Sequence, residues 1–132
     1  MKNKNTPFYV FLLLFVLLVV IVILYLLYDY AVSSPYVISA EKAKKLIRNH
    51  KIDLILDVRT DLERKTLGFY PGSVHIQSAD LDKKMPREFP NKKIHILAYC
   101  NSGQRARMAT EKLHKLGYKN SVYIATTYKS LM

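Results

Sequence analysis

The chain has one cysteine, Cys100, and the residues after it have the composition of an anion-binding turn. Asn101, Ser102 and Gly103 are small or polar, and Arg105 adds a cation. A helix that begins near Arg105 would direct unpaired N–H groups and the positive end of its dipole toward the sulfur, and Gly103 would let the backbone curl around one point. Such surroundings favour a thiolate, so we expect a lowered pKa and a nucleophilic thiol.

Two further observations bear on whether Cys100 reacts. Arg107 places a second cation near the start of the same helix. A lone cysteine at the end of a buried strand is more often a small, inert apolar residue. Such a residue, however, does not need a polar turn with a glycine and a cation after it, so we interpret Cys100 as a catalytic nucleophile.

The rest of the sequence alternates between strand-like and helical patterns. Apolar runs of strand length lie at residues 52–58, 74–76, 94–99 and 121–125. Helical patterns lie at residues 39–50, 78–84 and 105–116, with Gly117 placed to end the last helix. Strands that alternate with helices predict an α/β fold with a small open parallel sheet covered on both faces. Ligands bind such a sheet at the C-terminal ends of its strands, where Cys100 would lie.

Residues 8–28 carry no charge and are nearly all Leu, Val, Ile, Phe or Tyr. About 20 apolar residues cross a hydrocarbon core of about 30 Å, so this run predicts a transmembrane helix. The alternative, a cleaved signal peptide, has an apolar region of only about 7–15 residues. We therefore expect a short tail (residues 1–7), a transmembrane helix (8–30), a linker (31–36) and one domain (37–132).

The basic residues on either side of the span indicate its orientation. Lys2 and Lys4 precede it, whereas four basic residues follow within about 20 residues. These four are Lys42, Lys44, Lys45 and Arg48. The excess after the span favours a cytosolic domain, where a thiol enzyme would also find reduced partners.

The charge beyond the span limits the range of partners. This part of the chain has 19 basic and 10 acidic residues, which gives a net charge of +9. Such a surface attracts anions, whether solvent ions, the headgroups of a lipid bilayer or a small anionic substrate. Nucleic acid is not expected, because the chain has neither a recognised nucleic-acid motif nor a basic stripe interleaved with aromatic residues. The four histidines show no ligand spacing, so neither a metal site nor another cofactor is expected.

Three segments, in the right order, resemble the signatures of single-domain rhodaneses, the sulfurtransferase family. Tyr99 to Ala106 is similar to the active-site loop of that family. Asp57-Val58-Arg59 resembles its Asp-Val-Arg signature, and Glu63 followed by residues 68–76 resembles its Gly-His-Ile-Pro-Gly-Ala segment. The resemblance extends over residues 37–131, and together with the apolar run it implies a rhodanese-like domain behind a membrane anchor.

The resemblance also implies a role for each residue of the site. Cys100 would take a sulfane sulfur from a small anionic donor, thiosulfate or a persulfide, and hold it as a persulfide. Arg105 would hold the loop and face the donor. The loop residues whose N–H groups would surround the sulfur are Asn101, Ser102, Gly103, Gln104 and Arg105. A supporting polar network beneath the loop would consist of Asp57, Arg59 and Glu63, with Arg59 paired to Glu63.

One departure and one absence qualify these roles. Asn101 stands where the family commonly has Arg, which weakens the case for thiosulfate as the donor. Because the chain has no second cysteine, an external thiol or a partner protein must accept the sulfur.

Two other functions are compatible with the sequence. Phosphatases and arsenate reductases of the same fold have five residues between the cysteine and the arginine of the loop, whereas four separate Cys100 from Arg105. A membrane-tethered binding module, with a silent or redox-sensing cysteine, is the remaining alternative. The intact Cys, Gly and Arg of the loop favour the sulfurtransferase.

Overall fold

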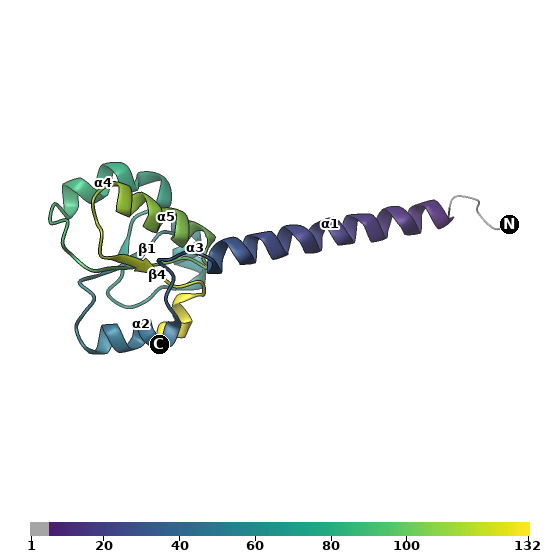
Figure 1. The fold of residues 1–132 in the computed structure, drawn as a ribbon. Helices are drawn as coiled ribbons and strands as arrows, with labels where there is room; N and C mark the ends of the chain where they lie inside the picture. Colours follow the sequence, from purple (N-terminus) through teal and green to yellow (C-terminus); the bar gives the residue numbers. More distant parts are fainter. Residues whose placement is uncertain (1–5) are drawn as a thin grey trace.

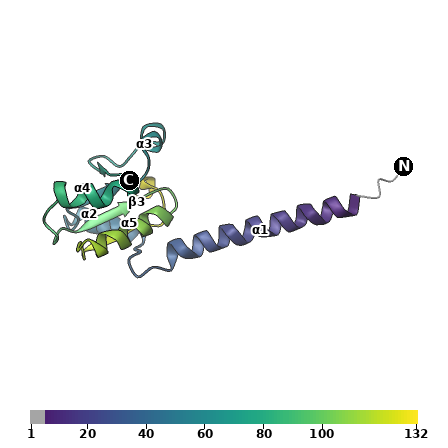
Figure 2. The same cartoon turned by 90° about the horizontal axis from the view of Figure 1, so that it is seen from above.

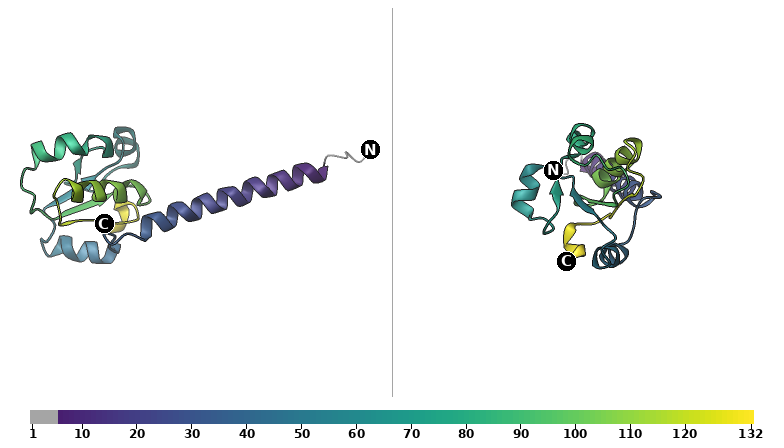
Figure 3. Two further views of the ribbon diagram at one scale, coloured as in Figure 1. Left: turned by 45° about the horizontal axis from the view of Figure 1, so that its top comes forward. Right: turned by 90° about the vertical axis from the view of Figure 1, so that its left-hand side faces the viewer.

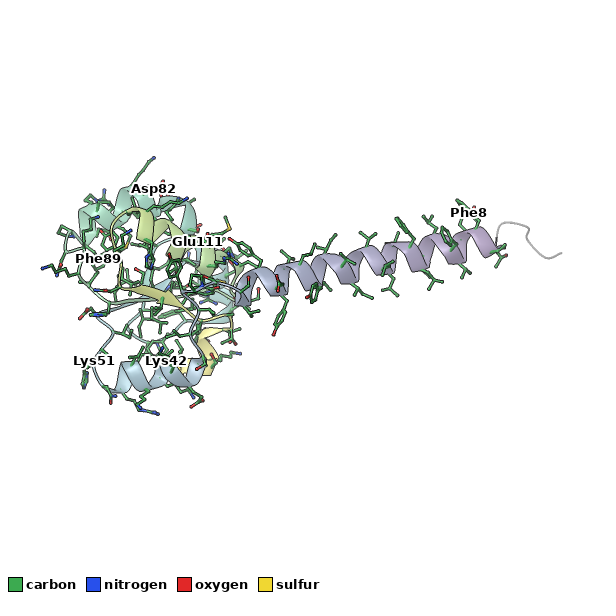
Figure 4. All side chains as sticks on the ribbon, viewed as in Figure 1. Phe8, Lys42, Lys51, Asp82, Phe89 and Glu111 are labelled. Atoms are coloured by element: carbon green, nitrogen blue, oxygen red, sulfur yellow. The ribbon has the colours of Figure 1, made fainter. Side chains whose placement is uncertain are left out.

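The computed structural model of the protein describes residues 6–132, and its first element is the long helix α1 (Thr6–Val32). Helix α1 projects from the folded domain, and its apolar side chains point outward on all sides (Figure 1, Figure 4). Its 27 residues span about 40 Å, so the helix is long and apolar enough to cross a bilayer. It extends beyond the predicted span of 8–30 at both ends, and most of the predicted tail 1–7 lies outside the described residues.

Within residues 6–132, four parallel strands form one sheet in the order β2-β1-β3-β4. The predicted α/β class with a small open parallel sheet is therefore confirmed. The strands are β1 (Leu54–Asp57), β2 (Val74–His75), β3 (Ile96–Tyr99) and β4 (Ser121–Tyr123).

Helices cover both faces of this sheet (Figure 1). One face carries α2 (Ala40–Arg48) and the C-terminal turn η2 (Tyr128–Leu131); the other carries η1 (Ser78–Asp80), α4 (Leu81–Glu88) and α5 (Gln104–Lys115). Successive side chains of a strand point to opposite faces. In β3, Ile96 and Ala98 therefore pack on the α5 side, and Leu97 and Tyr99 pack on the α2 side. Cys100 continues the alternation on the α5 side.

Two helix ends explain why the chain turns where it does. Ser39 caps α2, its hydroxyl accepting a hydrogen bond from the N–H of Lys42 at 3.2 Å. Helix α5 ends just before Gly117, which has a φ of +98°. The N–H groups of Gly117 and Tyr118 donate back to carbonyls of the last turn, the pattern that glycine permits. The predicted end of this helix is confirmed.

One helix was missed. α3 (Asp61–Leu67) begins with a capping box, in which the Thr60 hydroxyl accepts from the N–H of Glu63 while the Glu63 carboxylate accepts from the N–H of Thr60. Every residue of α3 is at least partly exposed, so the helix has no apolar face that a periodicity search could detect. Helix α3 lies on the side of the domain from which α1 leaves (Figure 1, Figure 2).

Candidate active site

Cys100 lies at the C-terminal end of β3, in the turn that leads into α5. Its side chain is 1% exposed and contacts the core on the α5 side. The N–H of Gly103 donates a hydrogen bond to the Cys100 sulfur over 3.1 Å. Because α5 begins at the next residue, the sulfur lies close to the N-terminus of a helix and to the positive end of its dipole.

Gly103 adopts a backbone conformation that brings this donor to the sulfur. Its φ is +105° and its ψ is −20°. A Cβ atom at this position would lie 2.8 Å from the Cα of Ala125 and 3.1 Å from the Cβ of Ala31. Both the positive φ and the close approach require glycine here.

Hydrogen bonds and an ion pair to Glu63 join the loop to α3. The two terminal nitrogens of Arg105 donate to the two Glu63 oxygens at 2.6 and 2.7 Å, and the Asn101 amide donates to the same carboxylate at 2.8 Å. A bidentate pair of this kind fixes orientation as well as charge. Because Glu63 matches the charge of Arg105, the loop holds less uncompensated positive charge than the sequence suggests.

Beneath the loop, Asp57 and Arg59 form a buried ion pair. The Arg59 guanidinium donates to both Asp57 oxygens at 2.8 and 2.9 Å, and both side chains are at most 1% exposed. Arg59 also donates to the Gly68 carbonyl at 2.6 Å and contacts the Asn101 oxygen at 3.4 Å. The buried pair is therefore connected to the loop through Asn101.

The hydrogen bonds fix the charge state of this network. Burial alone would raise the pKa of Asp57, but hydrogen bonds from Arg59 and Tyr99 outweigh it and hold that pKa below its usual value. Hydrogen bonds from Arg105 hold the pKa of Glu63 far below its usual range. Burial raises the pKa of Tyr99. At neutral pH both carboxylates are therefore ionised and Tyr99 is a hydrogen-bond donor.

One sequence-based assignment is wrong, and one cation has a partner that the sequence did not indicate. Arg59 does not pair with Glu63, because its guanidinium turns inward to Asp57 while Glu63, on the first turn of α3, faces the loop and pairs with Arg105. Arg107, the second cation near the start of α5, is engaged by another carboxylate. It pairs with Glu111 one turn further along α5, at 2.7 Å, so its charge is already matched.

Three residues of the network were missed. Tyr99 donates from its hydroxyl to Asp57 at 3.0 Å, Arg64 donates to the same Asp57 oxygen at 3.0 Å, and Ser73 accepts from Arg64 at 3.0 Å. A tyrosine at an inward strand position needs a partner for its hydroxyl, and this signal pointed to Tyr99. Arg64 lies on the helix whose only sequence signal was the capping box of Thr60 and Glu63.

Above the loop, a pocket of about 580 Å³ opens between the domain and the end of α1. The loop lines it with Asn101, Ser102, Gln104 and Arg105, and α1 lines it with Leu24, Leu27 and Tyr28. The predicted linker, 31–36, is not a free tether: α1 continues through Val32, and Ala31 is 1% exposed against the domain.

The sequence model of the rhodanese-like domain family matches residues 39–127, two thirds of the chain. The chain belongs to the rhodanese-like family. The match begins at the cap of α2 and ends after β4, so it contains the strands and helices that carry the loop and its polar network, and it leaves α1 outside.

Individual relatives of this rhodanese-like chain include sulfur-handling proteins. It is 32% identical over 87 residues to YrkF of Bacillus subtilis, which is named as a candidate sulfur carrier protein. That match covers 66% of this chain and 45% of YrkF, so the chain spans less than half of that relative's length.

Solved structures show the same fold. The human single-domain sulfurtransferase TSTD1 superposes with a TM-score of 0.62 at 22% identity, covering 74% of this chain and 95% of TSTD1. A Rhodopseudomonas palustris protein of unknown function, suggested to be a tyrosine phosphatase, superposes with a TM-score of 0.64 at 23% identity. This match covers 80% of this chain and 85% of that protein. At these identities the likeness concerns the fold alone, so the reaction has to be argued from the loop itself.

Proposed function

We propose that this protein is a membrane-anchored sulfurtransferase that moves a sulfane sulfur from a donor to an acceptor thiol through a persulfide on Cys100. The observation that carries the proposal is the position of the Cys100 sulfur, 3.1 Å from the Gly103 nitrogen at the start of α5. A thiolate or a persulfide anion at this point is stabilised by the N–H donors and by the helix dipole. Family membership and the YrkF relative support the same chemistry.

The transfer occurs in two steps. The Cys100 thiolate attacks the outer sulfur of the donor, a new S–S bond forms, and the old bond's electron pair leaves with sulfite or with a thiolate. An acceptor thiolate then attacks the terminal sulfur of the Cys100 persulfide and releases the Cys100 thiolate. Because the chain has no second cysteine, this acceptor comes from outside, as a small thiol or a protein cysteine.

The size of the loop favours sulfur over phosphate. Four residues separate Cys100 from Arg105, and Glu63 engages both terminal nitrogens of Arg105. A loop of this length has room for one sulfur atom, whereas a tetrahedral oxyanion requires a wider ring of donors and a cation free to bind its oxygens.

Anchoring by α1 is the second part of the proposal. Its support is the length and composition of the helix, together with the basic residues that follow it, which favour a domain in the cytosol. Extraction of the full chain by detergent but not by high salt is the expected behaviour, because apolar burial in a bilayer is not screened by ions. Resistance of the domain to protease added outside intact cells tests the orientation.

Mass spectrometry of the intact chain tests the sulfur chemistry. After incubation in detergent with thiosulfate or glutathione persulfide, wild type should gain the mass of one sulfur atom and lose it to cyanide or to a thiol. Cys100→Ser should gain nothing, whereas Ser130→Ala, which removes a hydroxyl that donates to the Thr127 carbonyl, should load as wild type does. A folded wild type that takes sulfur from neither donor would contradict the proposal.

One observation favours a second candidate function. Cys100 is only 1% exposed, as expected of an inert cysteine in a tethered binding module. Reaction therefore requires the loop to open transiently. Slow alkylation by iodoacetamide together with sulfur loading would support a gated enzyme, whereas alkylation only on unfolding, without loading, would support the binding module.

A further inference from the structure

The end of α1 is docked on the elements that form the active site. Gln104 of the loop donates from its side chain to the Leu27 carbonyl at 3.3 Å. Arg107 donates to the Tyr30 carbonyl and to the Ser33 hydroxyl, and its guanidinium lies 4.0 Å from the centre of the Tyr30 ring. Tyr30 is one of the last four residues of α1, whose carbonyls lack partners within a helix, so its carbonyl finds a donor in the domain.

A third contact restricts the direction of the helix. The Tyr123 hydroxyl donates to the Ala31 carbonyl, and Ala31 packs against Gly103. With donors from α5, β4 and the loop on its last turns, α1 leaves the domain in one direction. The ends of the strands that carry the loop face the side from which α1 projects (Figure 2, Figure 3).

This geometry places the mouth of the pocket at the membrane boundary. Leu24 and Leu27 belong to the uncharged run of 21 residues, which spans about 30 Å as a helix, the thickness of a hydrocarbon core. They therefore lie at the edge of the acyl region, with Tyr28 at headgroup level. Lys51 and Phe89 lie at the opposite end of the domain, away from the helix (Figure 4).

The pocket has two chemically different walls. The loop wall is polar and is formed by the side chains of Asn101, Ser102 and Arg105, the last of these paired with Glu63, whereas the α1 wall is formed by the side chains of Leu24 and Leu27. Its volume of about 580 Å³ is typical of a site for a small molecule. A compound with a polar sulfur head and an apolar chain matches both walls.

We infer that the sulfur donor is an amphiphilic hydropersulfide that enters from the membrane interface, with its sulfane sulfur at the loop and its alkyl chain on Leu24 and Leu27. This inference rests on the proposed function and names its substrate class. The Cys100 thiolate attacks the terminal sulfur of R–S–SH and forms the Cys100 persulfide. The old S–S bond breaks with its electron pair on R–S⁻, which takes up a proton and remains in the bilayer as the thiol.

A chain-length series tests the inference on the full chain in phosphatidylcholine nanodiscs. Ethyl, octyl and dodecyl hydropersulfides are compared by the rate at which Cys100 gains one sulfur in mass spectrometry. The octyl compound should load wild type at least about tenfold faster than the ethyl compound, because its chain is buried on the α1 wall. Partition into the bilayer would also favour longer chains, so the octyl-to-ethyl ratio has to be compared among variants.

Two double variants separate binding from partition. Leu24→Ala with Leu27→Ala removes the apolar wall, and the octyl-to-ethyl ratio should fall about tenfold. Val22→Ala with Leu26→Ala changes the opposite face of the helix, since residues two apart on α1 point about 200° apart, and should keep the ratio of wild type.

The outcomes distinguish this inference from the proposed function. Equal ratios in the two double variants would mean that the chain-length effect is partition alone, and the inference is then wrong. Loading by thiosulfate or ethyl hydropersulfide with no preference for the longer chain would also overturn the inference and leave the sulfurtransferase intact. No loading from any donor would overturn both.

Discussion

Replacing Gly103 by alanine should damage both the stability of the domain and the chemistry of Cys100. At a φ of +105° an L-residue is strained by about 1–2 kcal/mol. The new methyl group would also lie 2.8 Å from the Ala125 Cα and 2.9 Å from the Ala125 Cβ, and overpacking of this kind costs about 1–3 kcal/mol. We expect a total loss of about 2–5 kcal/mol, less a few tenths gained because alanine restricts the unfolded chain.

Gly72 provides a matched control for the backbone strain. Its φ is +80°, but a Cβ atom there would meet no described atom within 4 Å. Gly72→Ala should therefore lose only the strain, about 1–2 kcal/mol. The difference between the two variants isolates the close approach of the loop to Ala125.

Urea titration of the full chain in a non-ionic detergent, followed by tyrosine fluorescence, measures both losses as shifts in the midpoint at constant slope. Sulfur loading provides the second readout, because a displaced loop withdraws the Gly103 N–H from the Cys100 sulfur. Loss of one hydrogen bond to a charged sulfur, about 1.5 kcal/mol, corresponds to about tenfold in rate. Equal stability losses in the two alanine variants would refute the close-contact reasoning, and undiminished loading by Gly103→Ala would refute the role of its N–H.

Two further substitutions test the electrostatic contacts. Glu63→Gln retains the capping box but removes the charge opposite Arg105. Because the pKa of Glu63 is lower in the folded protein, the ion pair stabilises the fold at pH values above the unfolded pKa of about 4.3. This contribution is lost as the pH falls through the folded pKa. At neutral pH the free energy of unfolding of the wild type should therefore exceed that of Glu63→Gln by about 1 kcal/mol, a small difference because both side chains are partly exposed. In acid, the thermal unfolding curves of the two proteins should converge. Arg107→Gln removes donors from the end of α1, so the amides of residues 31–34 and 36 should exchange hydrogen faster by mass spectrometry. Arg87→Gln, which removes an exposed arginine paired with Glu88, should leave that exchange unchanged.

Local sequence signals predicted most of the domain, because its elements are short and strongly patterned. Strand β3 lies within the apolar run 94–99, and α5 ends just before Gly117, as the position of this glycine indicated. Helix α3 was missed because its side chains stay exposed, which leaves the capping box at Thr60 as the sole local signal. An element with a buried face shows a periodic apolar pattern that the sequence reveals. An element marked only by a helix cap lacks that pattern and is easily overlooked.

The contacts within the site were less predictable, because they join residues far apart in the chain. Glu63 and Arg105 are 42 positions apart, and nothing near either residue selects this pairing over one between Glu63 and Arg59. Docking of α1 is harder still to predict. It depends on backbone carbonyls and on the small side chain of Ala31, which a composition-based interpretation assigns to a linker.

The charges of the loop bear on the choice of donor. The loop has a single arginine, Arg105, whose terminal nitrogens are both occupied by Glu63, and neutral Asn101 stands next to the cysteine. Thiosulfate would bring two negative charges to a site where N–H dipoles, but few uncompensated cations, can stabilise them. A hydropersulfide brings one charge or none, and its apolar remainder is matched by the leucines of α1. Electrostatics and shape therefore favour the same class of donor, although they depend on different residues.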